Sequence, residues 1–245
     1  MDRFWSATRP RPGLLDSLLG VIFPIRCAGC GRRGVSVCAE CWPSIPWLGD
    51  EVCPFCASPT RLGRICQPCG DGTLALDGAR AACRFDGIAR TVVHDLKYRG
   101  NKPRAELLGD VLAETLQRRP LAIDVLVPVP LAPGRRRSRG FNQSDLIARH
   151  LGNRLGVLLL SSCLERIRET PPQVGRSDAE RRENVRGAFN CRDASAVRGR
   201  RVALVDDVMT TGSTLRECAH AIRAAGAARV YGVAAARASG TFDGT

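Results

Sequence analysis

"VALVDDVMTTGST", residues 202–214, combines in one short stretch the features that decide the fold. Its continuous apolar run is typical of a buried strand, and two carboxylates, Asp206 and Asp207, follow it. The hydroxyl-rich segment 210–214 comes next and leads into a helical pattern. Free backbone N–H groups at a helix N-terminus bind anions, and Gly212 permits close approach of the backbone. We therefore expect a phosphate at the hydroxyl-rich segment and sugar hydroxyls at the two carboxylates, which is the layout of a 5-phosphorylated ribose.

Two other interpretations of this stretch are weaker. An apolar run followed by two aspartates could be a Walker B strand, but the chain has no G-x-x-x-x-G-K-[ST] motif. Its only lysines, Lys97 and Lys102, do not follow a glycine. An acidic pair that caps the turn without any ligand is the second alternative. The sugar-phosphate interpretation is favoured because it accounts for the whole turn.

Strands and helices alternate along the chain around this stretch. Apolar runs with flanking turn residues indicate strands, and apolar residues at helical spacing indicate helices. The alternation predicts an α/β fold, with a mostly parallel sheet flanked by helices on both faces. Strands are predicted at residues 79–85, 122–130, 200–208 and 229–237, and helices at residues 88–98, 104–119, 144–157 with Ser144 as N-cap, and 213–228 ending near Gly226.

Eight of the twelve cysteines form four C-x-x-C pairs before residue 70. Residues 24–72 are rich in cysteine, proline and glycine and show no sustained period, so metal ions must stabilise this region. Two thiolates on each tight turn, and two turns for each ion, complete a tetrahedral zinc site with no open position for a catalytic water. We predict two structural zinc sites formed by Cys27, Cys30, Cys38, Cys41, Cys53, Cys56, Cys66 and Cys69.

The spacing leaves the order of pairing open. Sequential pairing gives a double zinc ribbon, and interleaved pairing, first with third, is also compatible with the sequence. Disulfides, an iron–sulfur cluster or a redox dithiol are alternatives, but paired knuckles in one short segment favour zinc in a reducing cytosol. The four remaining cysteines stand singly and are predicted to be small buried residues: Cys83, Cys163, Cys191 and Cys218.

The net charge and the N-terminal residues limit the classes of function that the protein can have. The formal net charge of +13 favours a polyanionic partner, either a phosphorylated metabolite or a nucleic acid, and two zinc ions held by eight thiolates lower the charge to about +9. The apolar run from Leu14 to Phe23 is too short to span a bilayer, contains Asp16 and precedes no small-residue cleavage site. We predict an N-terminal helix within residues 1–23, no membrane insertion and a cytoplasmic protein.

The stretch 202–214 is similar to the phosphoribosyl pyrophosphate (PRPP) signature of type I phosphoribosyltransferases. The chain as a whole resembles the ComF/GntX family, competence-associated proteins with an N-terminal zinc domain. Three further segments match in order: LKYRGN at 96–101, VPVPLAPGRRRSRGFNQSD at 127–145 and RIRETPPQVGRSDAERRENVRGAF at 166–189. The resemblance covers residues 20–237. It implies a double zinc ribbon at 24–72 and a Rossmann-like phosphoribosyltransferase domain at 73–238. Outside these two domains, the sequence itself predicts an N-terminal helix at 1–23, and the small polar residues 239–245 predict a flexible tail.

The resemblance also implies a role for individual residues. Asp206 and Asp207 would be catalytic and hold the ribose hydroxyls. PRPP would further contact Val208 and Met209, with its 5′-phosphate cradled by Thr210, Thr211, Gly212, Ser213 and Thr214. Pyrophosphate would bind near Leu131, Ala132 and Arg139. A flexible loop carrying Arg176, Arg181 and Arg182 would close over the reacting centre.

The implied reaction is displacement at ribose C1 by an unknown acceptor, assisted by magnesium. The alternative is a non-catalytic protein that handles single-stranded DNA and contacts the competence machinery, and a PRPP-responsive regulator is a third possibility. For the DNA alternative, Trp42, Trp47 and Phe55 either stack on bases or fill space beside the zinc sites. No Cys–His or Ser–His pair suggests a covalent nucleophile, and His94, His150 and His220 have no evident partner in the sequence.

Overall fold

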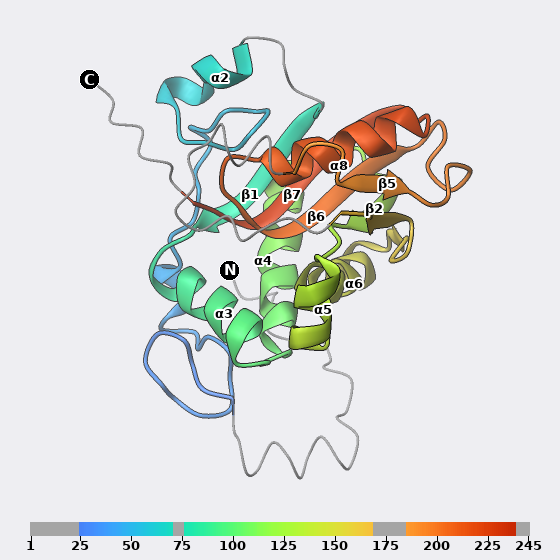
Figure 1. Cartoon of the computed structure of the whole chain (residues 1–245). Coiled ribbons are helices and arrows are strands. Elements are labelled where there is room, and N and C mark those ends of the chain that lie inside the picture. Colours follow the sequence, from blue (N-terminus) through green and yellow to red (C-terminus); the bar gives the residue numbers. More distant parts are fainter. Residues whose placement is uncertain (1–24, 71–75, 169–184, 239–245) are drawn as a thin grey trace.

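A central parallel sheet organises the computed structural model, which describes residues 25–70, 76–168 and 185–238 (Figure 1). The spatial order of its five strands is β1-β7-β6-β2-β3, and every neighbouring pair is parallel. These parallel strands confirm the predicted fold class. The strands are β1 (Gly78–Arg84), β2 (Val125–Pro128), β3 (Leu158–Leu159), β6 (Arg201–Met209) and β7 (Arg229–Arg237).

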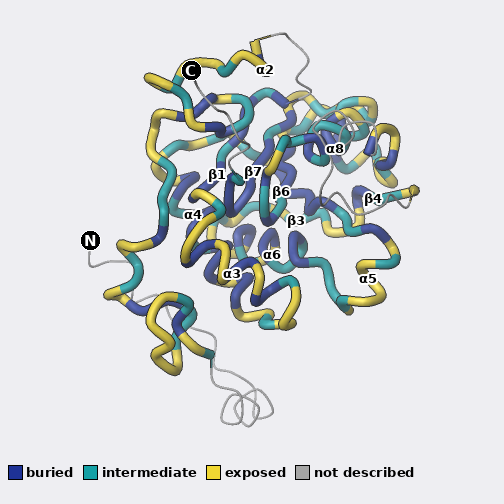
Figure 2. The backbone as a smooth tube through the Cα atoms, turned by 60° about the vertical axis from the view of Figure 1, so that its left-hand side comes forward, coloured by how far each residue is buried: buried dark blue, intermediate teal, exposed yellow. Residues whose placement is uncertain are grey.

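Helices cover both faces of this sheet, so its strands are apolar on both sides. In Figure 1, α8 lies on one face, and α3, α4 and α6 lie on the other. Alternate residues of β6 follow this division: Ala203 and Val205 belong to the core cluster of α3, α4 and α6, whereas Val202 and Leu204 belong to that of α8. Figure 2 shows the central strands buried along most of their length. The helices are α3 (Gly87–Tyr98), α4 (Arg104–Arg118), α5 (Pro133–Arg139), α6 (Gln143–Leu155) and α8 (Ser213–Ala224).

The predicted N-cap of the helix that begins near Ser144 is wrong by two residues. Helix α6 is capped by Asn142, whose side chain accepts a hydrogen bond from the Ser144 backbone N–H at 3.1 Å. Asn and Ser are equally good N-caps, so local preference does not choose between them. The Ser144 side chain is therefore available for a contact outside the helix.

A second, two-stranded antiparallel sheet pairs β4 (Leu164–Arg166) with β5 (Phe189–Cys191) and packs beside α8. Cys163 is buried next to this pair, whereas Cys191 is only half-buried, which corrects its prediction as a buried residue. The Sγ atoms of the two cysteines lie 3.6 Å apart. Cys83 and Cys218 are buried as predicted, and burial raises the pKa of the Cys83 thiol to about 12.

The described part of the cysteine-rich region, residues 25–70, contains short helical turns and isolated β-bridges, and its segment 46–48 packs along the outer side of β1. The turns are η1 (Trp42–Ser44), η2 (Arg61–Gly63) and α2 (Gln67–Gly70). The segment 46–48 runs antiparallel to β1: Arg84 N donates to Pro46 O at 2.8 Å, and Leu48 N donates to Ala82 O at 3.0 Å. Trp42 and Trp47 pack on the core with ring centroids 5.5 Å apart, so both fill space.

Several predicted features lie outside the described residues. They are the N-terminal helix at 1–23, the tail at 239–245 and the loop arginines Arg176, Arg181 and Arg182. In the part of the chain that the structure describes, no helix has both the length and the apolar character needed to cross a membrane.

Candidate functional site

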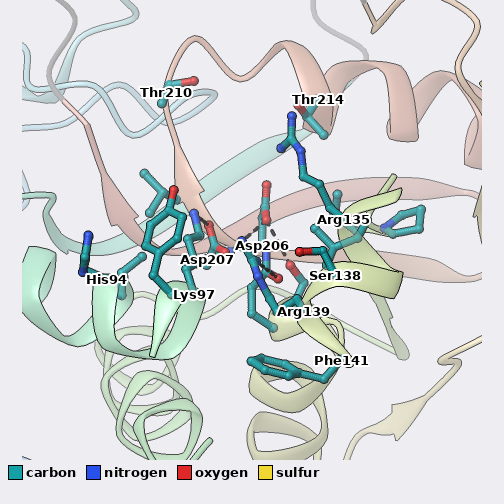
Figure 3. Close-up of a pocket in the computed structure, with 18 of the residues that line it drawn as sticks. His94, Lys97, Arg135, Ser138, Arg139, Phe141, Asp206, Asp207, Thr210 and Thr214 are labelled. Carbon is teal, nitrogen blue, oxygen red and sulfur yellow. Dashed lines mark hydrogen bonds and ion pairs between the residues drawn. The ribbon is translucent and has the colours of Figure 1, made fainter. Parts of the chain in front are cut away.

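The candidate site lies at the point where the strand order of the sheet reverses. Strands β2 and β6 are neighbours, but the chain leaves β2 toward β3 and leaves β6 toward β7, on opposite sides. The two following loops diverge, and ligands of open α/β sheets bind in the crevice that such divergence creates. A cavity of about 1040 Å³ occupies this position (Figure 3). Its lining comes mainly from the end of β6, from the loops after β2 and β6, from α3 and α5, and from the start of α6.

The predicted carboxylate pair lines this cavity. Asp206 Oδ1 accepts hydrogen bonds from the Ser144 hydroxyl at 3.0 Å and from the Asp207 backbone N–H at 2.9 Å. Asp207 Oδ1 pairs with Lys97 Nζ at 2.6 Å, and the two side chains point toward one another in Figure 3. Lys97, on α3, is therefore the counter-charge of the acidic pair.

The pKa of Asp206 is strongly shifted. Desolvation raises the pKa of Asp206 to about 7; the charge of Asp207 adds to this rise and Lys97 opposes it. Asp207 is buried, and its second oxygen, Oδ2, has no hydrogen-bond partner among the described residues. A buried carboxylate oxygen without a donor is costly. It fits a ribose hydroxyl or a divalent cation, the groups expected at this position.

The hydroxyl-rich turn forms the other wall. Gly212 adopts φ +76°, in the left-handed region that glycine tolerates, and serves as N-cap of α8 without any side-chain cap. The Thr211 and Ser213 hydroxyls lie 2.6 Å apart, and Ser213 N donates to Thr211 Oγ1 at 3.3 Å. Thr210 and Thr214 line the cavity. The turn thus brings hydroxyls to an uncapped helix N-terminus, where a phosphate is stabilised.

Of the other predicted site residues, some line the cavity and others are buried in the hydrophobic core. Leu131, Arg139 and Val208 line the cavity, and Arg139 Nη1 donates to Gln143 Oε1 at 2.5 Å. Ala132 and Met209 are buried and do not belong to the lining.

Sequence reasoning missed the functional position of Ser144, because it was assigned as a helix cap. It also gave no role to His94 or Tyr98, whose rings lie 4.7 Å apart on the cavity wall. His150, which had no evident partner in the sequence, lies 3.1 Å from Asp110 Oδ1.

The eight paired cysteines form two clusters, one within Cys27–Cys41 and the other within Cys53–Cys69, with the four sulfurs of each cluster within 4.8 Å of one another. The pairing is therefore sequential. The Cys27–Cys38 and Cys30–Cys38 sulfurs are 3.7 and 3.6 Å apart. Zinc–sulfur bonds of about 2.3 Å in a tetrahedron give sulfur separations of about 3.8 Å, so the geometry fits structural zinc.

Hydrogen bonds around Cys27 in the first cluster favour its thiolate. Burial raises the pKa of the Cys27 thiol, but backbone N–H groups outweigh this effect and lower the pKa to about 6. Two of these donors, Gly29 N and Cys38 N, lie 3.4 and 3.3 Å from the Cys27 sulfur. Four sulfurs around each position leave no open coordination place, so neither zinc site is built to activate water.

Comparisons with known proteins agree with both regions. Residues 18–70 match the double zinc ribbon domain family, and residues 109–241 match the phosphoribosyl transferase domain family. DNA utilization protein YhgH of Salmonella typhi is 34% identical over 215 residues, which cover 83% of this chain and 85% of that protein. Competence protein F of Haemophilus influenzae is 40% identical over 116 residues, 46% of this chain and 51% of that protein, so the match spans about half of its length. A solved glutamine PRPP amidotransferase from B. subtilis is 24% identical over 53% of this chain and 25% of that chain, with a TM-score of 0.36.

Proposed function

Because this chain belongs to the phosphoribosyl transferase domain family and carries a double zinc ribbon, we propose that it binds PRPP with magnesium in the cavity beyond β2 and β6. We further propose that it transfers the phosphoribosyl group to an acceptor.

The observation that carries this proposal is the unsatisfied Asp207 Oδ2 beside an uncapped helix N-terminus. Leaving a buried acceptor without a donor costs about 1–3 kcal/mol, and more when it is charged. A ligand that offers hydroxyl donors at one end and a phosphate at the other removes this penalty. A 5-phosphorylated ribose does both, with its hydroxyls at Asp206 and Asp207 and its phosphate at the turn from Thr210 to Thr214.

The transfer would be a displacement at ribose C1. The bond from C1 to the pyrophosphate oxygen breaks and its electron pair leaves with pyrophosphate, while a lone pair of the acceptor forms the new bond and the acceptor loses a proton. Asp206 and Asp207 would hold the ribose and stabilise positive charge that develops on the ring. Arg139 lies on the cavity wall where it could attract the leaving group. Bound magnesium would supply positive charge that offsets the charge growing on pyrophosphate.

Calorimetric titration of PRPP with magnesium tests the binding step. We expect saturable binding to the wild type and none to the double variant Asp206→Asn/Asp207→Asn. Asp124→Asn is the matched control, because Asp124 pairs with Arg201 at the start of β6, at the opposite end of that strand. Absence of heat with the wild type, or equal binding by the acidic-pair variant, would remove the proposed site. If binding is found, pyrophosphate release with candidate acceptors tests turnover.

A second candidate function, single-stranded DNA handling, is favoured by the arginines of α5 and the names of the relatives. Helix α5 carries Arg135, Arg136, Arg137 and Arg139. Arg135 and Arg139 line the cavity (Figure 3), and the net charge of the chain is +13. The names competence protein F and DNA utilization protein YhgH support a link to DNA uptake. Such binding would rest mainly on phosphate attraction, because Trp42 and Trp47 pack on the core. Of the three aromatic candidates, this leaves the half-buried Phe55 for stacking on bases.

Fluorescence anisotropy with a labelled single strand tests this candidate at two salt concentrations. Counterion release predicts a steep loss of affinity as salt rises. Replacing the exposed Arg136 by Gln should reduce both affinity and salt slope. Binding that is unchanged by salt would refute the electrostatic basis.

A further inference from the structure

Arg237 joins the second zinc cluster to the ribose-phosphate turn. It is the last residue of β7 and only 5% exposed. On one side, its Nη1 donates to the backbone carbonyls of Met209 at 3.1 Å, of Thr210, and of Ala238 at 2.7 Å. These contacts hold the chain at the point where β6 ends and the hydroxyl-rich turn begins.

The other side of the same guanidinium contacts the zinc ribbon. Nε donates to the Cys56 carbonyl at 3.0 Å, and Nη2 donates to Ser58 Oγ at 2.6 Å. Ser58 Oγ in turn lies 3.2 Å from the Cys56 sulfur. One planar side chain therefore spans from a zinc-ligating knuckle to the turn of the candidate site, with every contact buried or partly buried.

The charge of Arg237 needs a counter-charge. Among the described residues, no carboxylate pairs with it, and its neighbours are carbonyls and one hydroxyl. Four thiolates around one zinc ion carry a formal charge of about −2. Since Cys56 is one of these four residues, the loaded second cluster supplies negative charge next to the buried guanidinium. Zinc loss would leave that cation poorly compensated and its contacts weakened.

We propose that Arg237 is a positioning residue that makes the ribose-phosphate turn depend on zinc in the second cluster. The inference rests on the proposed function for its ligand, but the link between zinc and turn stands on the contacts of Arg237 alone. By thermodynamic reciprocity, zinc in this cluster favours ligand binding at the turn, and ligand binding raises the affinity of this cluster for zinc. We expect the higher zinc affinity to appear as slower zinc release.

The chain provides a matched control in Arg104. It is also buried, 3% exposed, and also holds a ribbon: it donates to Ser36 O at 2.5 Å and Arg26 O at 2.8 Å in the first ribbon. It pairs with Asp95 rather than with the turn. Arg104→Met therefore loosens a ribbon without touching the turn, whereas Arg237→Met does both.

The test compares wild type, Arg237→Met, Arg104→Met and Ser58→Ala by three measurements. They are the affinity for PRPP with magnesium, the rate of zinc release to a chromogenic chelator, and hydrogen exchange of the backbone at residues 208–214. Ser58→Ala removes one contact of Arg237 on the ribbon side, together with the contact between Ser58 Oγ and the Cys56 sulfur. It protects the test against loss of folding. Arg237→Lys keeps the charge and should restore part of the effect.

We expect Arg237→Met to weaken PRPP binding at least about tenfold, as for loss of one charge-assisted hydrogen bond. It should also speed release of one of two zinc ions and raise exchange at the turn. Ser58→Ala should do the same to a smaller degree. Arg104→Met should speed release of the other zinc and leave the turn unchanged. PRPP should slow only the zinc release that Arg237→Met accelerates.

Equal effects of Arg237→Met and Arg104→Met on the turn would overturn the proposal, as would unchanged exchange and zinc release in both Arg237→Met and Ser58→Ala. If the wild type binds no PRPP, the proposed function fails, yet exchange at the turn and zinc release still decide whether Arg237 couples the two.

Discussion

Replacing Lys97 by methionine should destabilise the ligand-free protein and make its stability depend more strongly on pH. Lys97 Nζ lies 2.6 Å from Asp207 Oδ1, and the two side chains are 21% and 4% exposed. Their attraction at an effective dielectric constant of about 20 is about 6 kcal/mol. Desolvation of both charges offsets much of this, and breaking such a pair from one side typically costs about 3–5 kcal/mol. Because Lys97 keeps some contact with water, we expect a loss near the lower end, about 3 kcal/mol.

The pH dependence follows from Asp206. Its pKa is raised to about 7 by desolvation and by Asp207, and Lys97 holds it down; without Lys97 it rises further. A carboxyl whose folded pKa exceeds its unfolded value of about 3.9 binds protons more tightly when folded. Its contribution to stability is fully present below the unfolded pKa and is lost as pH rises through the folded pKa. The Lys97→Met defect should therefore be largest above about pH 8 and smaller near about pH 6.

Urea unfolding at these two pH values, with zinc present in the buffer, measures the effect. The double variant Lys97→Met/Asp207→Asn is the control, because it removes both charges and should recover to within about 1 kcal/mol of wild type. A loss below about 1 kcal/mol at the higher pH, or an equal loss at both, would refute the assignment of Lys97 as the buried counter-charge.

Three other predictions concern the site, the zinc clusters and a packed glycine. PRPP affinity should fall as pH drops below about 7, because protonated Asp206 accepts hydrogen bonds poorly; Asp206→Asn titrated in parallel gives the ligand's own pH dependence, and identical profiles would contradict the prediction. Chelation should remove two zinc ions per chain and unfold the ribbons, as monitored by metal analysis and circular dichroism; an unchanged spectrum after complete zinc loss would exclude a structural role. Gly152→Ala should destabilise by about 1–3 kcal/mol, because an added Cβ would lie 2.8 Å from the Val157 carbonyl. Gly49→Ala, with no atom within 4 Å of an added Cβ, should leave the melting temperature near wild type, and equal shifts in both variants would argue against a steric cause.

The sequence predicted four of the five strands of the parallel sheet and missed β3, which has only two residues. Strands β6 and β7 are buried on both faces, so their apolar runs predicted their bounds to within a residue. The turn after β6 could also be recognised as a candidate ligand site, because its paired carboxylates, hydroxyls and glycine lie within one short stretch of the sequence.

Contacts between segments that are distant in the sequence could not be predicted from local sequence patterns. The Arg237–Cys56 contact joins residues 181 positions apart, and Ser144 meets Asp206 across 62 positions. Lys97 showed no local pattern that distinguished a buried ion pair from a solvated lysine. The pairing order of the cysteines was also open, because either order satisfies the same spacing. In each case, the deciding information is which segments the fold places side by side.

The antiparallel docking of residues 46–48 along β1 also bears on how the edge of the sheet is protected. An outermost strand with unpaired backbone groups is a template for pairing with other molecules, and proteins avoid aggregation by covering it. Here the cover is a segment between two zinc-stapled knuckles. A fragment beginning at residue 76 would expose β1 and should self-associate through it. Loss of zinc from the ribbons should therefore also uncover this edge of the α/β domain.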